Sequence, residues 1–64
     1  MKMWICRSRM GMLKISNSKP SLNKDGSRWE ADGCGYYLPF EEFPEVTFEN
    51  SPMEVELVLI KKNQ

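Results

Sequence analysis

The chain has 64 residues, with nine basic and nine acidic side chains, no His and two Cys. This length corresponds to one domain, residues 1–64, near the size at which a hydrophobic core alone gives only about 3 to 5 kcal/mol of net stability. The composition excludes a zinc site of the usual Cys and His kind within one chain, and no segment reaches the roughly 18 apolar residues of a membrane span.

The first strand is expected at residues 2–7, with the sequence KMWICR. Trp, Ile and Cys favour extended structure, and the segment ends at a turn-forming polar stretch. Side chains alternate across a strand, so only one set can face the core. The pattern leaves two choices for that set, either Met3 and Ile5 or Trp4 and Cys6.

A second strand is expected at residues 12–16, MLKIS, after a short polar connection at residues 8–11. The apolar alternation resumes there, and two such runs separated by a short connection predict a β-hairpin. The alternation sorts the side chains into two opposed faces: Leu13 and Ile15 against Met12 and Lys14.

Residues 17–27 form the clearest loop of the chain, with Pro20, Gly26 and several Asn and Ser side chains. Gly26 is expected to supply a positive φ in a tight turn, because glycine adopts that conformation without steric cost. Residues 28–31 then predict a short strand that buries Trp29.

Residues 36–39 are expected to return beside this strand after a turn at residues 32–35, which would give a second hairpin. Residues 40–45 allow one turn of helix, whose length Pro44 limits. Residues 46–48 form either a short strand or an extended lead-in to the last strand.

The longest and most hydrophobic strand is expected at residues 53–60, because Pro52 can begin a strand but cannot lie within its hydrogen-bonded interior. The alternate residues that start at Met53 should face the core. The opposite set changes from glutamates to Val58 and Ile60. We therefore expect another segment or another subunit to cover both faces of its far end.

These elements together predict an all-β fold. It is a small meander or half-open barrel of four to five short antiparallel strands, with at most one helical turn near residues 40–45. No internal repeat or low-complexity segment interrupts the pattern. The long last strand is expected to close the sheet and to supply much of the core.

The charges are unevenly distributed along the chain. Apart from two lysines near the end, the basic side chains precede Trp29, whereas residues 30–56 carry acidic side chains and no basic one. This pattern fits a basic patch for an anion or nucleic acid, or an acidic face for a basic partner. We favour the interpretation that the basic first half and the acidic second half neutralise each other in the folded chain, because a committed nucleic-acid binder usually has an overall basic excess. It would pair Lys2 and Arg7 with Glu54 and Glu56 across the sheet.

The sequence predicts no catalytic residue, no cofactor and no metal site. Cys34 lies between two glycines, but a nucleophilic thiol needs a base or a nearby cation, and the chain has no His. Catalytic carboxylates need pKa values shifted by burial or close pairing. The glutamates of the Pro-containing segment are expected to be solvated instead: Glu41, Glu42, Glu45 and Glu49.

The aromatic content, two Trp, two Tyr and three Phe, is high for this length. Core packing accounts for some of these side chains. Tyr36 and Tyr37 are adjacent, so on a strand they face opposite ways and one should be exposed. An exposed Tyr near arginines and Trp could stack on a base or a ligand cation, or it could line a subunit interface. The candidate binding surface is Arg7, Arg9, Arg28, Trp29, Tyr36 and Tyr37.

Several segments resemble a group of short hypothetical proteins from gut anaerobic bacteria and their phages. The group has a W-I-x-R opening and an FPEV-x-[WF]-E-x-x-P-x-EVEL close, which correspond here to MWICR at residues 3–7 and FPEVTFENSPMEVEL at residues 43–57. Lys19-Pro20, Trp29 and residues 37–39 also match. The resemblance implies a phage or mobile-element accessory protein inside a bacterial cell, and it transfers no catalytic or binding residue.

We expect a non-enzymatic domain that binds another protein and self-associates as a homo-oligomer. Small-ligand or nucleotide binding, as in a sponge that sequesters a signalling nucleotide, and single-stranded nucleic-acid binding are the alternatives. No membrane or metal partner is expected. A cytoplasmic, reduced setting is predicted, because charges interrupt the apolar opening segment and no small-residue cleavage site follows. A disulfide between Cys6 and Cys34 is accordingly not expected.

Overall fold

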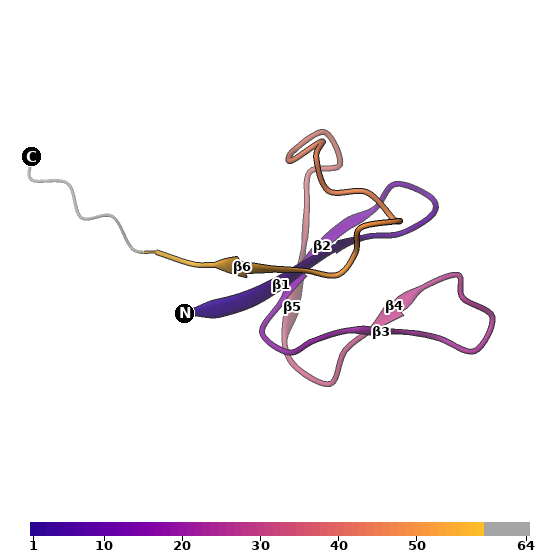
Figure 1. Ribbon diagram of the computed structural model, residues 1–64, viewed down its shortest axis with the longest axis horizontal. Helices are drawn as coiled ribbons and strands as arrows, with labels where there is room; N and C mark the ends of the chain where they lie inside the picture. The colour runs from indigo at the N-terminus through magenta and orange to yellow at the C-terminus, as the bar shows by residue number, and fades with distance from the viewer. Residues whose placement is uncertain (59–64) are drawn as a thin grey trace, which may run out of the picture.

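The computed structural model describes residues 1–58 (Figure 1). These residues contain no helix long and apolar enough to cross a membrane. They form six short strands: β1 (Lys2–Arg7), β2 (Leu13–Ser16), β3 (Ser21–Leu22), β4 (Trp29–Glu30), β5 (Gly35–Leu38) and β6 (Met53–Glu56).

Four of the strands form one antiparallel sheet in the order β5-β2-β1-β6, and β3 pairs with β4 in a separate two-stranded sheet. The expected all-β fold of short antiparallel strands is confirmed, and the larger sheet is open and does not close into a barrel. The first predicted hairpin is also confirmed, since β1 pairs with β2 and Ile5 lies opposite Ile15.

The second predicted hairpin is wrong. β5 pairs with β2 rather than with β4, and β4 pairs with β3 (Figure 1). The β5–β2 pairing places Leu38 opposite Leu13, next to the core, whereas the two-residue β4 offers an edge with few hydrogen bonds. Burial of an apolar side chain therefore determines which neighbour β5 adopts.

The hydrophobic core lies on one face of the four-stranded sheet. Its buried centre is Ile5 from β1, Leu13 from β2 and Val46 from the irregular segment before β6. Residues 46–48 form no strand, so Val46 reaches the core from an irregular segment. Four further side chains are partly buried against this centre: Ile15, Leu38, Met53 and Val55.

Strand β1 is covered on both faces over part of its length, because the adjacent side chains Ile5 and Cys6 point to opposite faces and are each only 3% exposed. The structure answers the choice that the sequence left open, since Met3 and Ile5 occupy the core face. On the opposite face Cys6 is also buried, and Trp4 is half-buried. A strand that is covered on both faces carries apolar side chains on both, which is why KMWICR shows no clean alternation.

The predicted loop at residues 17–27 contains β3 and leads through a tight turn into β4. Asn23 Oδ1 accepts hydrogen bonds from the backbone N–H groups of Ser27 and Arg28. Gly26 has a φ of 72°, as the sequence predicted. Hydrogen bonds from the Ser27 side chain and backbone hold the pKa of the Asp25 carboxyl below its ordinary value.

Gly26→Ala is expected to lower the free energy of unfolding by about 1 kcal/mol. No atom lies within 4 Å of the added Cβ, so the cost comes from the positive φ and not from a clash. Urea denaturation measures the change. Lys24→Ala, in the same turn, is the control and should change stability by less than about 0.5 kcal/mol. Equal stability of the two variants would contradict the prediction.

Strand β6 ends at Glu56, earlier than the sequence predicted. Met53 and Val55 face the core and the glutamates face outward, which confirms the predicted alternation. Leu57 is 54% exposed and Val58 is 66% exposed, so no segment among residues 1–58 covers them. The rest of the predicted strand lies outside the described residues.

The predicted neutralisation between the two ends of the sheet is confirmed for one basic residue. β1 lies antiparallel to β6, and Lys2 Nζ is 3.3 Å from Glu54 Oε2. The prediction is wrong for Arg7, whose guanidinium turns to the loop that precedes β6. Its side chain lies on the core face, opposite to the outward glutamates, so it cannot reach them across the ladder.

No helical turn forms at residues 40–45. Phe43 has a φ of 51°, which is incompatible with a right-handed helix, and its carbonyl accepts a hydrogen bond from Val46 N–H in a turn. The turn directs Val46 into the core. It leaves Phe40 71% exposed and Phe43 48% exposed.

Candidate functional site

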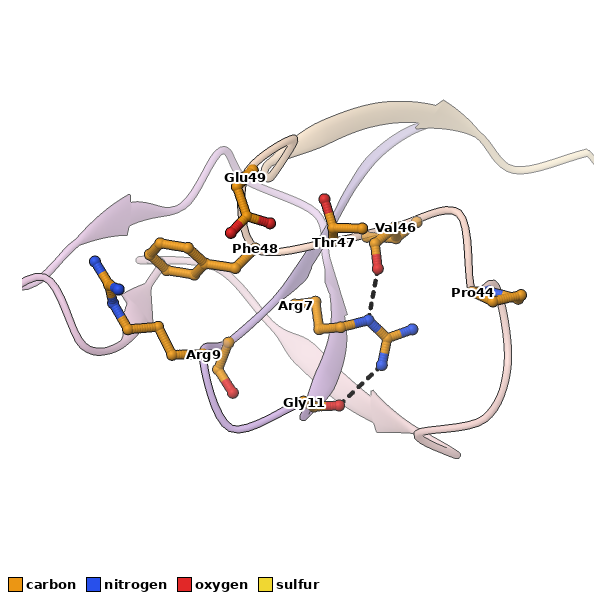
Figure 2. A pocket seen from close by; sticks show the side chains of 9 residues that line it. Arg7, Arg9, Gly11, Pro44, Val46, Thr47, Phe48 and Glu49 are labelled. Carbon is orange, nitrogen blue, oxygen red and sulfur yellow. Dashed lines mark hydrogen bonds between the residues drawn. The ribbon is translucent and has the colours of Figure 1, made fainter.

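The Arg7 guanidinium is the centre of the polar contacts on the core side of the sheet. Nη1 donates to Gly11 O at 2.8 Å and to Phe40 O at 2.9 Å. Nη2 donates to Glu42 O at 2.9 Å and to Phe43 O at 3.1 Å. Nε donates to Val46 O, and Figure 2 marks this bond and the one to Gly11.

These bonds give Arg7 a structural role. A guanidinium has five N–H donors in a fixed fork, and here five backbone carbonyls accept from it. Four of these carbonyls belong to residues 40–46, so Arg7 holds that loop against β1 and the β1–β2 turn. A phosphate could bind the side chain only by displacing these carbonyls.

Arg9 lies in the same pocket but contacts an aromatic ring. Its Cζ is 4.3 Å from the centroid of the Phe48 ring, and Nε donates to Gly26 O. The Trp29 ring packs at 5.9 Å from Phe48, and Trp29 Nε1 donates to Arg7 O. The open pocket beside this stack has a volume of about 380 Å³, and Glu49 lines it together with the arginines (Figure 2).

A second concavity opens on the face of the sheet opposite to the core. We call it the Met-Trp hollow and define it by six side chains. It has a volume of about 100 Å³, and Cys6 lies within its wall. The β1–β2 turn, β2, the β3–β4 hairpin and β5 contribute the six: Met10, Met12, Lys14, Arg28, Trp29 and Tyr37.

The Met-Trp hollow is apolar, exposed and positively charged. Met10 is 89% exposed, Met12 is 51% exposed and Tyr37 is 66% exposed. Lys14 Nζ lies 5.5 Å from the centroid of the Tyr37 ring. No carboxylate lines the hollow, and within residues 1–58 neither Lys14 nor Arg28 forms an ion pair. Its potential is therefore suited to an anionic group beside an apolar one.

The two thiols lie in different surroundings. Burial raises the pKa of the Cys6 thiol, and the positive charge of Lys14 opposes this shift only in part. Cys34 is exposed on the turn before β5, and both cysteines are free. In the described part of the chain no three Cys, Asp or Glu side chains gather in a way that could hold a metal ion.

The structure divides the predicted binding surface into three places. Arg28, Trp29 and Tyr37 come together in the Met-Trp hollow, and Arg7 and Arg9 line the other pocket. Tyr36 lies apart, since it pairs with Ile15 on the core face whereas Tyr37 pairs with Lys14. The two tyrosines face opposite sides of the sheet as predicted, and both of them, rather than one, are exposed.

Sequence reasoning missed three residues of the hollow, Met10, Met12 and Lys14. A signal for two of them existed, since the alternation of β2 had already placed Met12 and Lys14 opposite to the core set. Met10 belongs to the turn, and no periodicity predicts where a turn side chain will lie.

The chain matches no protein-family model, no curated protein and no solved structure.

Proposed function

We propose that this chain is a small, non-enzymatic interaction protein that binds a protein partner through the Met-Trp hollow. The partner contributes an apolar or aromatic side chain flanked by carboxylates. One observation carries the proposal: large apolar side chains stand exposed around two cations, Lys14 and Arg28, with no carboxylate in the lining.

The chemistry of the hollow is that of a protein-binding surface. Methionine is flexible and polarisable, so it adapts to partner side chains of different shapes. Trp, Tyr and Arg are the side chains that most often dominate binding energy in protein interfaces. Trp29 is fixed by its hydrogen bond to Arg7 O, so little side-chain entropy is lost at this position on binding.

Lys14 and Arg28 supply the charge preference of the proposal. Opposite charges at the rim of an interface accelerate association and disfavour partners of the wrong charge. A carboxylate beside an apolar anchor would meet Lys14 and Arg28 while its anchor enters the hollow. On the resemblance to bacterial and phage proteins, the proposal places this binding activity in an accessory protein of a mobile element.

Tyr37→Ala is expected to weaken binding to acidic, aromatic peptides by about tenfold or more, because the ring forms a wall of the hollow. The measurement is a fluorescence titration of the full chain against a peptide library that varies in charge and aromatic content. The peptides of this library that bind most tightly should carry an aromatic residue next to Asp or Glu.

Tyr36→Ala is the matched control. Tyr36 is the neighbouring residue in β5, has nearly the same exposure and faces the other side of the sheet. Peptide affinity should stay unchanged in this variant. Equal loss in both variants, or enrichment of basic peptides, would overturn the proposal.

Nucleotide binding is a second candidate function, favoured by the Arg9 side chain stacked on Phe48 beside the larger pocket. Two features oppose it. The N–H donors of Arg7 are taken by carbonyls, and Glu49 in the same lining repels phosphate. A thermal-shift assay against cyclic and linear nucleotides tests it, and stabilisation that disappears in Arg9→Ala would support it.

A further inference from the structure

We propose that the partner in the Met-Trp hollow is a second copy of this chain, whose acidic loop docks there. The acidic loop is the segment at residues 40–45, with the sequence FEEFPE. This inference rests on the proposed function and names its partner. Each chain carries one acidic loop and one hollow, so both halves of the contact are present in a single protein.

The acidic loop has the chemistry that the hollow requires. Phe40 is 71% exposed and Phe43 is 48% exposed, which is unusual for Phe in a soluble domain of this size. The glutamates of the loop are also exposed, and they form no ion pair with residues 1–58. The loop therefore offers aromatic anchors, and the carboxylates beside them are complementary in charge to Lys14 and Arg28 of the hollow.

The acidic loop is held in place before it binds. Arg7 donates hydrogen bonds to the carbonyls of Phe40, Glu42 and Phe43, so the backbone is fixed while the side chains stay free. A segment that is already ordered loses less conformational entropy on docking than a mobile one. Arg7 thus prepares the loop for contact with a partner.

The acidic loop and the Met-Trp hollow of one chain cannot contact each other. The acidic loop lies on the core side of the sheet, where Arg7 binds its carbonyls and the next residue, Val46, enters the core. The hollow opens on the opposite side, beside Cys6. Both lie at the end of the sheet that holds the β1–β2 turn, since Phe40 O and Gly11 O share the Arg7 guanidinium and Met10 lies in that turn. A second copy can therefore approach this end and engage both surfaces.

The association is expected to be weak, because the patches are small compared with a stable protein interface. If both pairs of surfaces engage together, the complex closes as a two-fold dimer. Otherwise it extends head to tail. In both cases the contact is between the acidic loop of one copy and the hollow of another.

The test uses charge reversal in two separate full-length variants. The first, Lys14→Glu with Arg28→Glu, makes the hollow acidic. The second, Glu41→Lys with Glu45→Lys, makes the loop basic. Light scattering at about 200 µM chain, a range suited to micromolar contacts, should give an average mass clearly above 7.5 kDa for the unmodified protein. Each variant alone should remain a monomer, because its own loop and hollow then carry the same charge.

An equimolar mixture of the two variants should associate again, because each loop then meets a hollow of opposite charge. Far-ultraviolet circular dichroism of each variant establishes that both are folded. The matched control is Glu54→Lys with Glu56→Lys, on β6 and away from both surfaces, which should associate like the unmodified protein.

The possible outcomes separate this inference from the proposed function. If the unmodified protein is a monomer at this concentration, or the mixture of folded variants stays monomeric, the second copy is not the partner. If such a monomer still binds acidic, aromatic peptides in a way that depends on Tyr37, the proposed function stands and only this inference fails. If neither contact occurs, both fail.

Discussion

Replacing Arg7 with alanine is expected to lower the free energy of unfolding by about 2 to 4 kcal/mol. Five hydrogen bonds from the guanidinium to backbone carbonyls are lost together. Several of them are exposed to solvent, so their sum is well below five times the value of a buried charged bond. The loss is most of the roughly 3 to 5 kcal/mol that a core of this size supplies.

Chemical denaturation followed by tryptophan fluorescence measures this effect. Arg7→Lys should be destabilised nearly as much, because one ammonium group cannot reach carbonyls spread around a planar fork. This variant separates geometry from charge. Since residues 40–46 lose their attachment, their amide protons should exchange faster than those of β1 and β2 in both variants.

Arg9→Ala is the control for Arg7. Arg9 lies two residues along the chain, and its only hydrogen bond within the described residues is to Gly26 O, at 3.2 Å. Its contact with Phe48 is exposed, so the change in stability should stay below about 1 kcal/mol. If Arg7→Ala were no less stable than Arg9→Ala, the structural role assigned to Arg7 would be wrong.

The second large effect is expected at the centre of the core. Leu13→Ala should cost about 2 to 5 kcal/mol, the range for a buried leucine that leaves a cavity. Leu13 is 1% exposed and packs between β1, β5 and the segment that carries Val46. Because the whole domain has little more stability than this, we expect the variant to be largely unfolded at 25 °C.

The measurement for Leu13→Ala is circular dichroism together with the dispersion of amide proton signals in a two-dimensional NMR spectrum. Met12→Ala is the control, since Met12 is the preceding residue and is 51% exposed on the opposite face. It should unfold at nearly the same denaturant concentration as the unmodified protein. A folded Leu13→Ala variant with unchanged stability would show that the core lies elsewhere.

The strands could be predicted from the sequence where the apolar alternation is local. β1 begins and ends at the predicted residues, and β2 and the start of β6 follow their predicted patterns. The turn at Gly26 was predictable from residue type alone. The pairing of β5 was not, because the sequence between β4 and β5 is compatible with a hairpin and only the position of the core favours β2.

The candidate site was likewise only partly predictable from the sequence. Arg28, Trp29 and Tyr37 were predicted together and lie together, but Arg7 was grouped with them and has a different role. Nothing in the local pattern distinguishes an arginine that binds a ligand from one that binds its own backbone. The role of Arg7 depends on residues 40–46, which lie more than thirty positions away in the sequence and supply the carbonyls that it binds.

The sequence by itself determined the all-β class, the faces of β2 and β6, and the segregation of basic and acidic residues between the two halves. These properties depend on side chains a few positions apart. Only the tertiary structure decided that β5 pairs with β2, that Arg7 holds the acidic loop and that the Met-Trp hollow forms at all. Each of these features joins distant segments, and such contacts are selected by the burial of the whole core rather than by any local preference.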